Sequence, residues 1–428
     1  MTSFLDGQAK YGVSASMTDL PLSLASSVSK RPISSEIASV QVPSQTGSQG
    51  ANGNSTFLIN APRSYIKSGS VYMKCKVAHN ATLGPGHVVF NSPCGLASAI
   101  FRNLTVYAGT YPIEQKLYSN IWRDLLALHV GGRNFLNSDL GILENANPVN
   151  FTTPANSSIP VAGVIVCVAL PLNTFLGEQD FPAFLIPNPL MITVEYDSIV
   201  NSLYSASVTT QPSTMTISSA LLGYEEIRMD SDYINSLKAS MVANNIPYQI
   251  KIDQVGAVKF AKTQSQTYQF PVNASSVKAV IVTHVDEPTQ TSESKAYIAD
   301  ATVNTDESLV LNILLDGKRV NQYQLNDLTT QYMELQKAFG VLGDVTQTFA
   351  LGVDSRSTTF DNYRTVGYAS GVNCNRFMEN MALTGMSANN VTVEYTTAGN
   401  TAGCATYVFV VYNTILTISA SGDVQLMR

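Results

Sequence analysis

The sequence predicts an all-β protein built from two tandem antiparallel β-sandwiches. The chain has 428 residues, and single hydrophobic cores stop growing near about 250 to 300 residues, so two domains are expected. From Phe57 onward, short apolar alternations such as SVYMKCKV (70–77) and LMITVEY (190–196) are separated by Gly, Pro and Asn, which is the pattern of strands. Two landmarks then recur in the same order about two hundred residues apart, which indicates a duplicated unit.

The first landmark is a strand, a tight turn and a helix. NLTVYAGTYPIEQ leads into KLYSNIWRDLLAL, and NILLDGKRVNQYQ leads into LNDLTTQYMELQKAF, with Gly109 and Gly317 in corresponding turns. Apolar residues spaced three and four apart predict that each helix lies with one face on a sheet. These residues are Leu117, Ile121, Leu125 and Leu128 in the first copy, and Leu325, Leu328, Tyr332, Leu335 and Phe339 in the second.

The second landmark is a five-residue strand, ITVEY at 192–196 and VTVEY at 391–395. A polar loop and a long closing strand follow each copy, MTISSALLGYEEI in the first and CATYVFVVYNTILTIS in the second. Since side chains alternate along a strand, the Ile, Val and Tyr residues should face a core while Thr and Glu face away from it.

These landmarks define the expected domains. Residues 1–54 are rich in Ser, Gln, Gly and Ala and are expected to form a flexible polar arm. The two sandwiches are expected at 55–228 and 246–420. Between them, at 229–245, Asp230 or Ser231 can cap a linker helix that carries Ile234, Leu237 and Met241 on one face. Residues 421–428 are left as a C-terminal tail.

The charge pattern limits the classes of partner. Only 13% of the residues are charged, and the net charge is −6 without a Lys/Arg-rich arm, so direct nucleic-acid binding is not expected. A surface of low charge favours close packing of many copies. The first residues lack a secretory signal pattern, and the longest apolar stretch, 161–170, is too short to span a bilayer.

No metal, cofactor or catalytic site is expected. The five cysteines, Cys75, Cys94, Cys167, Cys374 and Cys404, include no C-x-x-C pair, which argues against a zinc site and a disulfide framework. The four histidines, His79, His87, His129 and His284, are interpreted as structural. Cys75 before His79, and Asp286 or Glu287 after His284, are the nearby potential ligands, and neither pair is backed by a second one.

Three further candidates have structural interpretations. Asp316-Gly317 resembles the start of a calcium loop but lacks its other ligands, so a hairpin turn is expected. The acidic pairs Glu225/Glu226 and Asp286/Glu287 could suggest a glycosidase, but adjacent residues on a strand point to opposite faces. Trp122, the only tryptophan, lies in the helical stripe and is expected to pack. No phosphate-binding or nucleophile-elbow motif occurs, and the GPG at 84–86 fits a simple turn.

Several segments together resemble the double jelly-roll major capsid proteins of tailless membrane-containing bacteriophages, adenoviruses and related DNA viruses. They are the turn and helix at 109–128, LPLNTFLGEQDFPAFLIPNPLMITVEY (170–196), LLGYEEIRMDSDYINSL (221–237), DGKRV (316–320) and VFVVYNTILTIS (408–419). The likeness covers nearly all of the chain after the arm. It implies two eight-stranded jelly rolls, each with a helix in an inter-strand connection.

The resemblance also implies a function. Three copies would form a pseudo-hexameric capsomer, and capsomers would build an icosahedral virion shell inside the host cell. The implied partners are the chain itself, as a homotrimer and in neighbouring capsomers, minor capsid and vertex proteins, and an internal membrane where the virus has one. Two alternatives stay open: a carbohydrate- or receptor-binding double β-sandwich such as an adhesin or viral spike, and a β-sandwich hydrolase.

Overall fold

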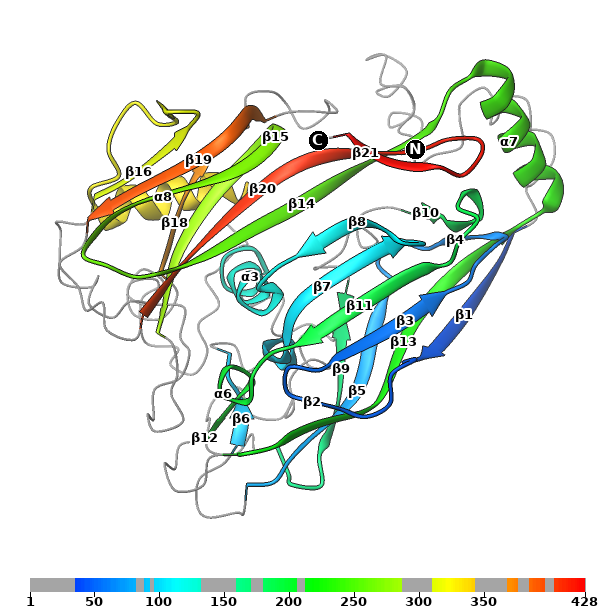
Figure 1. The fold of residues 1–428 in the computed structure, drawn as a ribbon, viewed down its shortest axis with the longest axis horizontal. Coiled ribbons are helices and arrows are strands. Elements are labelled where there is room, and N and C mark those ends of the chain that lie inside the picture. Colours follow the sequence, from blue (N-terminus) through cyan, green and yellow to red (C-terminus); the bar gives the residue numbers. More distant parts are fainter. Residues whose placement is uncertain are drawn as a thin grey trace.

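A computed structural model of the chain describes residues 35–81, 88–92, 96–131, 159–170, 180–205, 212–286, 310–342, 368–375, 385–396 and 404–427. Strands dominate, with short helices between them, as expected for the all-β class. Two strand-rich sandwiches lie side by side, and strands β14 and β20 run from the second sandwich past the first (Figure 1).

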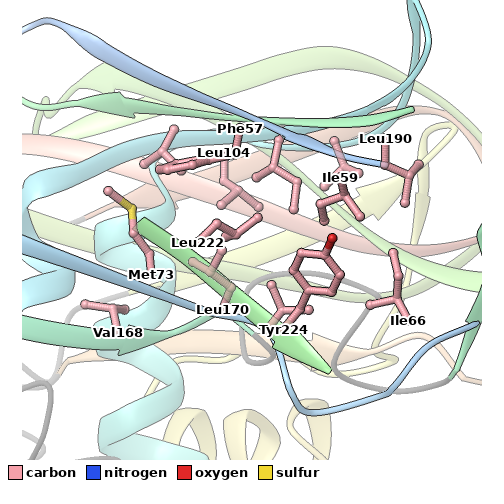
Figure 2. Packing of buried hydrophobic residues seen from close by; sticks show 14 of the residues in the cluster. Phe57, Ile59, Ile66, Met73, Leu104, Val168, Leu170, Leu190, Leu222 and Tyr224 are labelled. Carbon is pink, nitrogen blue, oxygen red and sulfur yellow. The ribbon is translucent and has the colours of Figure 1, made fainter. Parts of the chain in front are cut away.

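The first sandwich consists of two facing sheets. One contains β1 (Ser35–Pro43), β2 (Gln49–Gly50), β4 (Ser64–Ile66), β5 (Tyr72–His79), β9 (Val164–Ala169), β10 (Phe181–Pro182) and β13 (Met215–Met229). The other contains β3 (Asn54–Ile59), β7 (Phe101–Ala108), β8 (Tyr111–Lys116) and β11 (Leu190–Tyr196). Figure 2 shows Phe57, Leu104 and Leu190 from the second sheet meeting Met73 and Leu222 from the first in one buried cluster. A short ribbon of β6 (Val88–Phe90) and β12 (Leu203–Ser205) lies beside them.

The second sandwich is built around one long strand, β15 (Ser265–Asp286). Its first part pairs with β19, and its second part pairs with β18 and β20, with register shifts between them. Because such shifts bend a strand, β15 can serve both layers of the sandwich. The other strands are β14 (Tyr248–Ala261), β16 (Val310–Leu315), β17 (Lys318–Arg319), β18 (Ala369–Asn373), β19 (Met386–Thr396), β20 (Cys404–Ile418) and β21 (Val424–Met427).

The two copies of the strand-turn-helix landmark have matching structures. β7 and β8 form a hairpin that turns at Gly109, whose φ is +62°, and β16 and β17 form one that turns at Gly317, whose φ is +77°. Both values lie in the left-handed region, where glycine has no steric cost. Helices α3 (Ser119–Leu126) and α8 (Leu328–Ala338) follow the hairpins. A π-helical turn, η2 (Ala127–Gly131), extends α3, and η1 (Ala97–Ile100), η6 (Ala183–Leu185) and α6 (Ile199–Ser202) are shorter.

The second landmark is confirmed as well. β11 pairs antiparallel with β7, and β19 pairs antiparallel with β16, so corresponding strands have corresponding neighbours. The predicted inward residues are all buried: Ile192, Val194 and Tyr196 in the first copy, and Val391, Val393 and Tyr395 in the second. Sequence alternation therefore identified the core-facing side of both strands.

Helix α7 (Ser231–Asn244) connects the sandwiches. Asp230 is its N-cap, and the side chain of Asp230 accepts a hydrogen bond from the N–H of Asp232 at 3.2 Å. Ile234, Leu237 and Met241 are buried, as the spacing predicts. The helix ends at Asn245, whose φ of 50° is a common helix-terminating conformation for asparagine.

The prediction of a flexible arm over residues 1–54 is wrong from Ser35 onward, where the chain forms strands. β1 pairs antiparallel with β13 along its whole length, from Ser35↔Met229 to Pro43↔Leu221, and β2 pairs with the same strand. The segment lacks aromatic residues, but Val40 and Val42 pack against the first core. Backbone hydrogen bonds to β13 satisfy the polar groups of the strand. Residues 1–34 lie outside the described part of the chain.

The expected C-terminal tail is likewise part of the fold up to Met427. β21 pairs with β20, and the side chains of Val424 and Leu426 pack against the first core. That core also receives five residues from the two long strands of the second sandwich: Tyr248, Ile250, Ile252, Leu416 and Ile418. A boundary drawn along the sequence therefore does not separate the two hydrophobic cores.

Candidate functional site

The most distinctive local arrangement is the contact between the two sandwiches, which we call the seam. Helix α3 of the first sandwich presents Tyr118 and Trp122 to β20 of the second. The ring of Tyr118 meets that of Tyr407 edge-on at 5.0 Å, and the ring of Trp122 lies 5.3 Å from that of Phe409. These residues share one buried cluster that also includes residues of β14 and β15. The predicted packing role of Trp122 is confirmed, but the sheet that it packs on belongs to the other sandwich.

β20 can serve the seam because it is buried on both faces. Val408 and Val410 point into the core of the second sandwich, while Tyr407 and Phe409 point toward α3. A continuous apolar run is typical of a strand covered on both sides. The apolar run YVFVV therefore packs against a different hydrophobic cluster on each face of the strand.

A backbone contact also crosses the seam. β14 and β8 pair in parallel at Val255↔Lys116, which joins the second sandwich to one sheet of the first. Beside it, the side chain of Gln254 donates a 2.7 Å hydrogen bond to the carbonyl of Ile113. Glu114 and Lys116 form an ion pair at 3.0 Å with almost no exposed side-chain surface. A buried pair of this kind is costly to break, because the remaining charge stays in a medium of low polarity.

The described histidines have structural partners. His79 is buried, its Nε2 donates to the carbonyl of Ile159 at 2.7 Å, and its Nδ1 accepts from the N–H of Ala81 at 3.1 Å. His129 is buried at the seam and stacks on Phe339 from the second sandwich with 5.6 Å between ring centroids. His87 lies outside the described residues.

His284 lies in the interior of the second sandwich. Its Nδ1 is 3.0 Å from Oγ1 of Thr406, and its ring stacks on Tyr368. Complete burial, reinforced by nearby Lys262, lowers the pKa of His284 to about 3. Desolvation disfavours the charged imidazolium, so this side chain is neutral near neutral pH.

The acidic pair Glu225/Glu226 behaves as strand geometry predicts. Glu225 faces outward and pairs with Lys67 at 2.6 Å. Glu226 is buried and accepts hydrogen bonds from Ser64 at 3.2 Å and Tyr224 at 3.3 Å. The two carboxylates lie on opposite faces and cannot flank one bond. The side chain of Asp286 and the whole of Glu287 lie outside the described part of the structure.

The predicted hairpin turn at Asp316-Gly317 is confirmed. Both residues have positive φ, 49° and 77°, which is typical of a two-residue hairpin loop. Oδ1 of Asp316 accepts from the backbone N–H of Asn389 at 3.0 Å and of Asn390 at 2.8 Å. Its carboxylate therefore binds the edge of β19.

The described cysteines are free thiols. Cys75 points into the first core, whereas Cys167 on the neighbouring strand is half-buried on the other face of the sheet. Burial raises the pKa of the Cys75 thiol to about 12, which makes it unreactive. Cys94 is not among the described residues.

Sequence reasoning missed a polar group on α3. Asn120, Arg123 and Asp124 are all buried, and Arg123 is among the largest side chains with essentially no exposed surface. Asn120 and Asp124 are one helical turn apart and line a cavity at the seam. The available signal was their spacing of four residues beside the apolar stripe, which pointed to one shared face.

Within the described ranges, no three His, Cys, Asp or Glu side chains gather in a way that could hold a metal ion. No helix of the described chain has both the length and the apolar character needed to cross a bilayer.

Comparison of the fold with solved structures finds similar double jelly-roll proteins. The quasi-atomic model of the PBCV-1 virus capsid matches with a TM-score of 0.59 and 11% sequence identity, over 93% of this chain and 98% of that one. The Faustovirus major capsid protein matches with a TM-score of 0.55 and 10% identity, over 90% of each chain. The Sputnik virophage structure matches with a TM-score of 0.52 and 12% identity, over 93% of this chain and 89% of that one.

At the level of sequence, no protein-family model and no curated protein matches the chain. The similarity is therefore one of fold: two tandem jelly-roll sandwiches that extend over nearly the whole length of the relatives.

Proposed function

We propose that this chain is a major capsid protein, the structural subunit of an icosahedral virion shell. The observation that carries the proposal is that two matched sandwiches form one body, through the seam around Trp122 and the β8–β14 contact. One chain then supplies two similar building blocks. The solved structures of the same fold reported above are viral capsids and a major capsid protein.

The mechanism that we propose is geometric. Three chains joined by heterologous contacts close into a ring, and because each chain contributes two similar sandwiches, the ring has a pseudo-hexagonal outline. Such trimers tile a shell through contacts between neighbouring capsomers. The low charge of the chain, 13% of residues, reduces repulsion between closely packed copies.

The residues before β1 have a proposed role in assembly. β1 forms a ladder with β13 from Ser35 onward, and no other described strand pairs with its second edge. We propose that residues 1–34 act between copies and tie neighbouring subunits together on the inside of the shell.

The remaining elements of the function follow from the same proposal. The chain works without catalysis and without a cofactor, and it does not bind nucleic acid directly, since its net charge is −6. Its partners are other copies of itself, minor capsid and vertex proteins, and, in a virus that has one, an internal membrane. Its location is the virion capsid, assembled inside the host cell.

The test is the mass and shape of the purified chain. Light scattering coupled to size-exclusion chromatography should give about three times 46.1 kDa, and negative-stain images should show hexagonal outlines or shells. A monodisperse monomer at high concentration would contradict the proposal and favour the carbohydrate- or receptor-binding alternative, which a glycan-binding screen would then examine.

A further inference from the structure

The seam joins a sheet of each sandwich into one continuous sheet. β8 is the end strand of a sheet in the first sandwich, and it pairs in parallel with β14, the end strand of a sheet in the second, at Lys116↔Val255. The described strands therefore follow one path of pairing from β3 to β17. Within one chain, the first sandwich thus extends a sheet of the second along the free edge of β14.

β14 has a counterpart in the first sandwich. It pairs with β20, β20 pairs with the second part of β15, and that part pairs with β18. In the first sandwich β1, β13, β5 and β9 are linked in the same way, and all of these pairs are antiparallel. The matched strands also have the same order along the chain. β1 is therefore the counterpart of β14.

β8 has a counterpart in the second sandwich. It pairs with β7 up to Leu104↔Lys116, and the chain that begins at β17 runs beside β16 up to the bridge Leu311↔Leu325. Leu325 thus takes the place of Lys116, the residue that contacts β14. The helices that follow differ, since α3 docks on the other sandwich whereas α8 lies on β18 of its own. The correspondence therefore concerns the strands.

The two counterparts each have an edge without a neighbour among the described strands. β1 pairs only with β13, and β17 pairs only with β16. β1 is nine residues long, its one charged residue is Glu36, and Ile37 is 60% exposed. A long edge with few charges is a ready template for another strand, and folded proteins normally cover such an edge.

The charges on these two edges are opposite. Lys318 and Arg319 form β17, and both are exposed. The side chain of Glu36 is 75% exposed and lies 3.9 Å from Arg228, an exposed pair that contributes little. Because β8 and β14 run in parallel, a contact of the same kind between β17 and β1 places the starts of both strands at one end. Lys318 and Arg319 then lie near Glu36 and attract it.

We propose that β17 of one chain lies in parallel along the free edge of β1 in a second copy of this chain, as β8 lies along β14 within one chain. β1 and the hairpin of β16 are at opposite sides of the molecule in Figure 1, so the contact has to join two copies. The inference rests on the capsid function proposed above and names the edges through which subunits join. Since the two edges differ, the contact is heterologous, and contacts of this kind can close into a ring.

Charge reversal tests the contact in trimers of the full chain, by light scattering over a dilution series. Glu36→Arg and Arg319→Glu should each raise the concentration of half-dissociation by about three- to tenfold, because like charges then face each other. The double variant Glu36→Arg/Arg319→Glu restores the attraction and should recover most of this loss. Lys74→Glu is the control and should have no effect, since Lys74 is exposed on β5, which has a neighbouring strand on each side.

A covalent link tests which edges meet. A chain that carries both Glu36→Cys and Arg319→Cys, treated with a short bis-maleimide, should give linked dimers and trimers on a denaturing gel. Each single variant should give only the background of the native cysteines. The link depends on proximity alone, so it decides the question even where a charge reversal lowers the Tm.

Two outcomes would overturn the inference in different ways. Wild-type trimers that tolerate both reversals, with no links between copies in the chain that carries both cysteine substitutions, would exclude the β17–β1 contact and leave the capsid proposal standing. A wild-type chain that stays monomeric at high concentration would contradict the contact and the capsid proposal together.

Discussion

The rings of Trp122 and Phe409 lie 5.3 Å apart with an angle of 40° between their planes, although they belong to different sandwiches. Trp122 also lies 6.1 Å from Phe339, which follows α8. The only tryptophan of the chain is thus placed where both units of the duplication meet. The seam is a packed core in its own right, and its stability can be measured.

Replacing Trp122 with alanine should destabilise the chain by about 3–5 kcal/mol, because it removes a large buried ring from a packed cluster. Urea unfolding followed by far-UV circular dichroism measures this loss. Tyr111→Ala is the control, since Tyr111 is an aromatic residue of the first sandwich that is 42% exposed, and its cost should stay below about 1 kcal/mol. Equal losses in the two variants would mean that the seam adds little to stability.

Gly223 lies under the ring of Tyr72 on the neighbouring strand. A Cβ at Gly223 would come within 2.1 Å of Cζ of Tyr72, so Gly223→Ala must displace the ring and break its 3.0 Å hydrogen bond from Gln41. The expected cost is about 1–3 kcal/mol. Gly256→Ala is the matched control in β14, where the nearest atom would be 3.5 Å away. A thermal melt of both variants should show a lower Tm for Gly223→Ala only.

His284 should make the stability of the chain depend on pH. Its pKa is about 3 in the folded protein and 6.5 in an unfolded chain, so between these values the unfolded state binds the additional proton. The free energy of unfolding is therefore unaffected by His284 above pH 6.5. It decreases as the pH falls from 6.5 toward 3, by up to about 1.4 kcal/mol per pH unit.

Unfolding free energies of the wild type and His284→Gln, measured between pH 7 and pH 4, test this coupling. The variant should have the flatter profile, because the group that titrates has been removed. Parallel profiles would assign the acid sensitivity of the chain to other groups.

Truncations should distinguish residues 1–34 from β1. A chain beginning at Ser35 retains every described strand and should keep its Tm. A chain beginning at Ser44 lacks β1, leaves one edge of β13 unpaired from Leu221 to Met229, and should melt lower and aggregate. If the capsid proposal is correct, the chain that begins at Ser35 should still form trimers but assemble shells poorly. Loss of trimers from that truncation would show that residues 1–34 act within the capsomer.

The fold class, the duplication and the inward faces of the key strands can all be predicted from the amino-acid sequence. Alternation at Ile192, Val194 and Tyr196, glycine at positions 109 and 317, and the cap and apolar spacing of α7 are local signals, and each is visible within a few residues. Local backbone preference and side-chain periodicity suffice for such features.

Which surfaces meet depends on how the folded chain packs and is not visible in the sequence. The stripe on α3 predicted contact with a sheet, but the docking of Trp122 on β20 depends on how the two sandwiches pack. In the same way, residues 35–43 have weak strand signals, and their pairing with β13 depends on an edge that other strands create.

The cavity around Asn120 likewise brings together residues distant in the sequence, from Asn120 to Asp197 and Tyr407. Contacts between distant segments are set by packing of the whole chain, and no window of the sequence contains them.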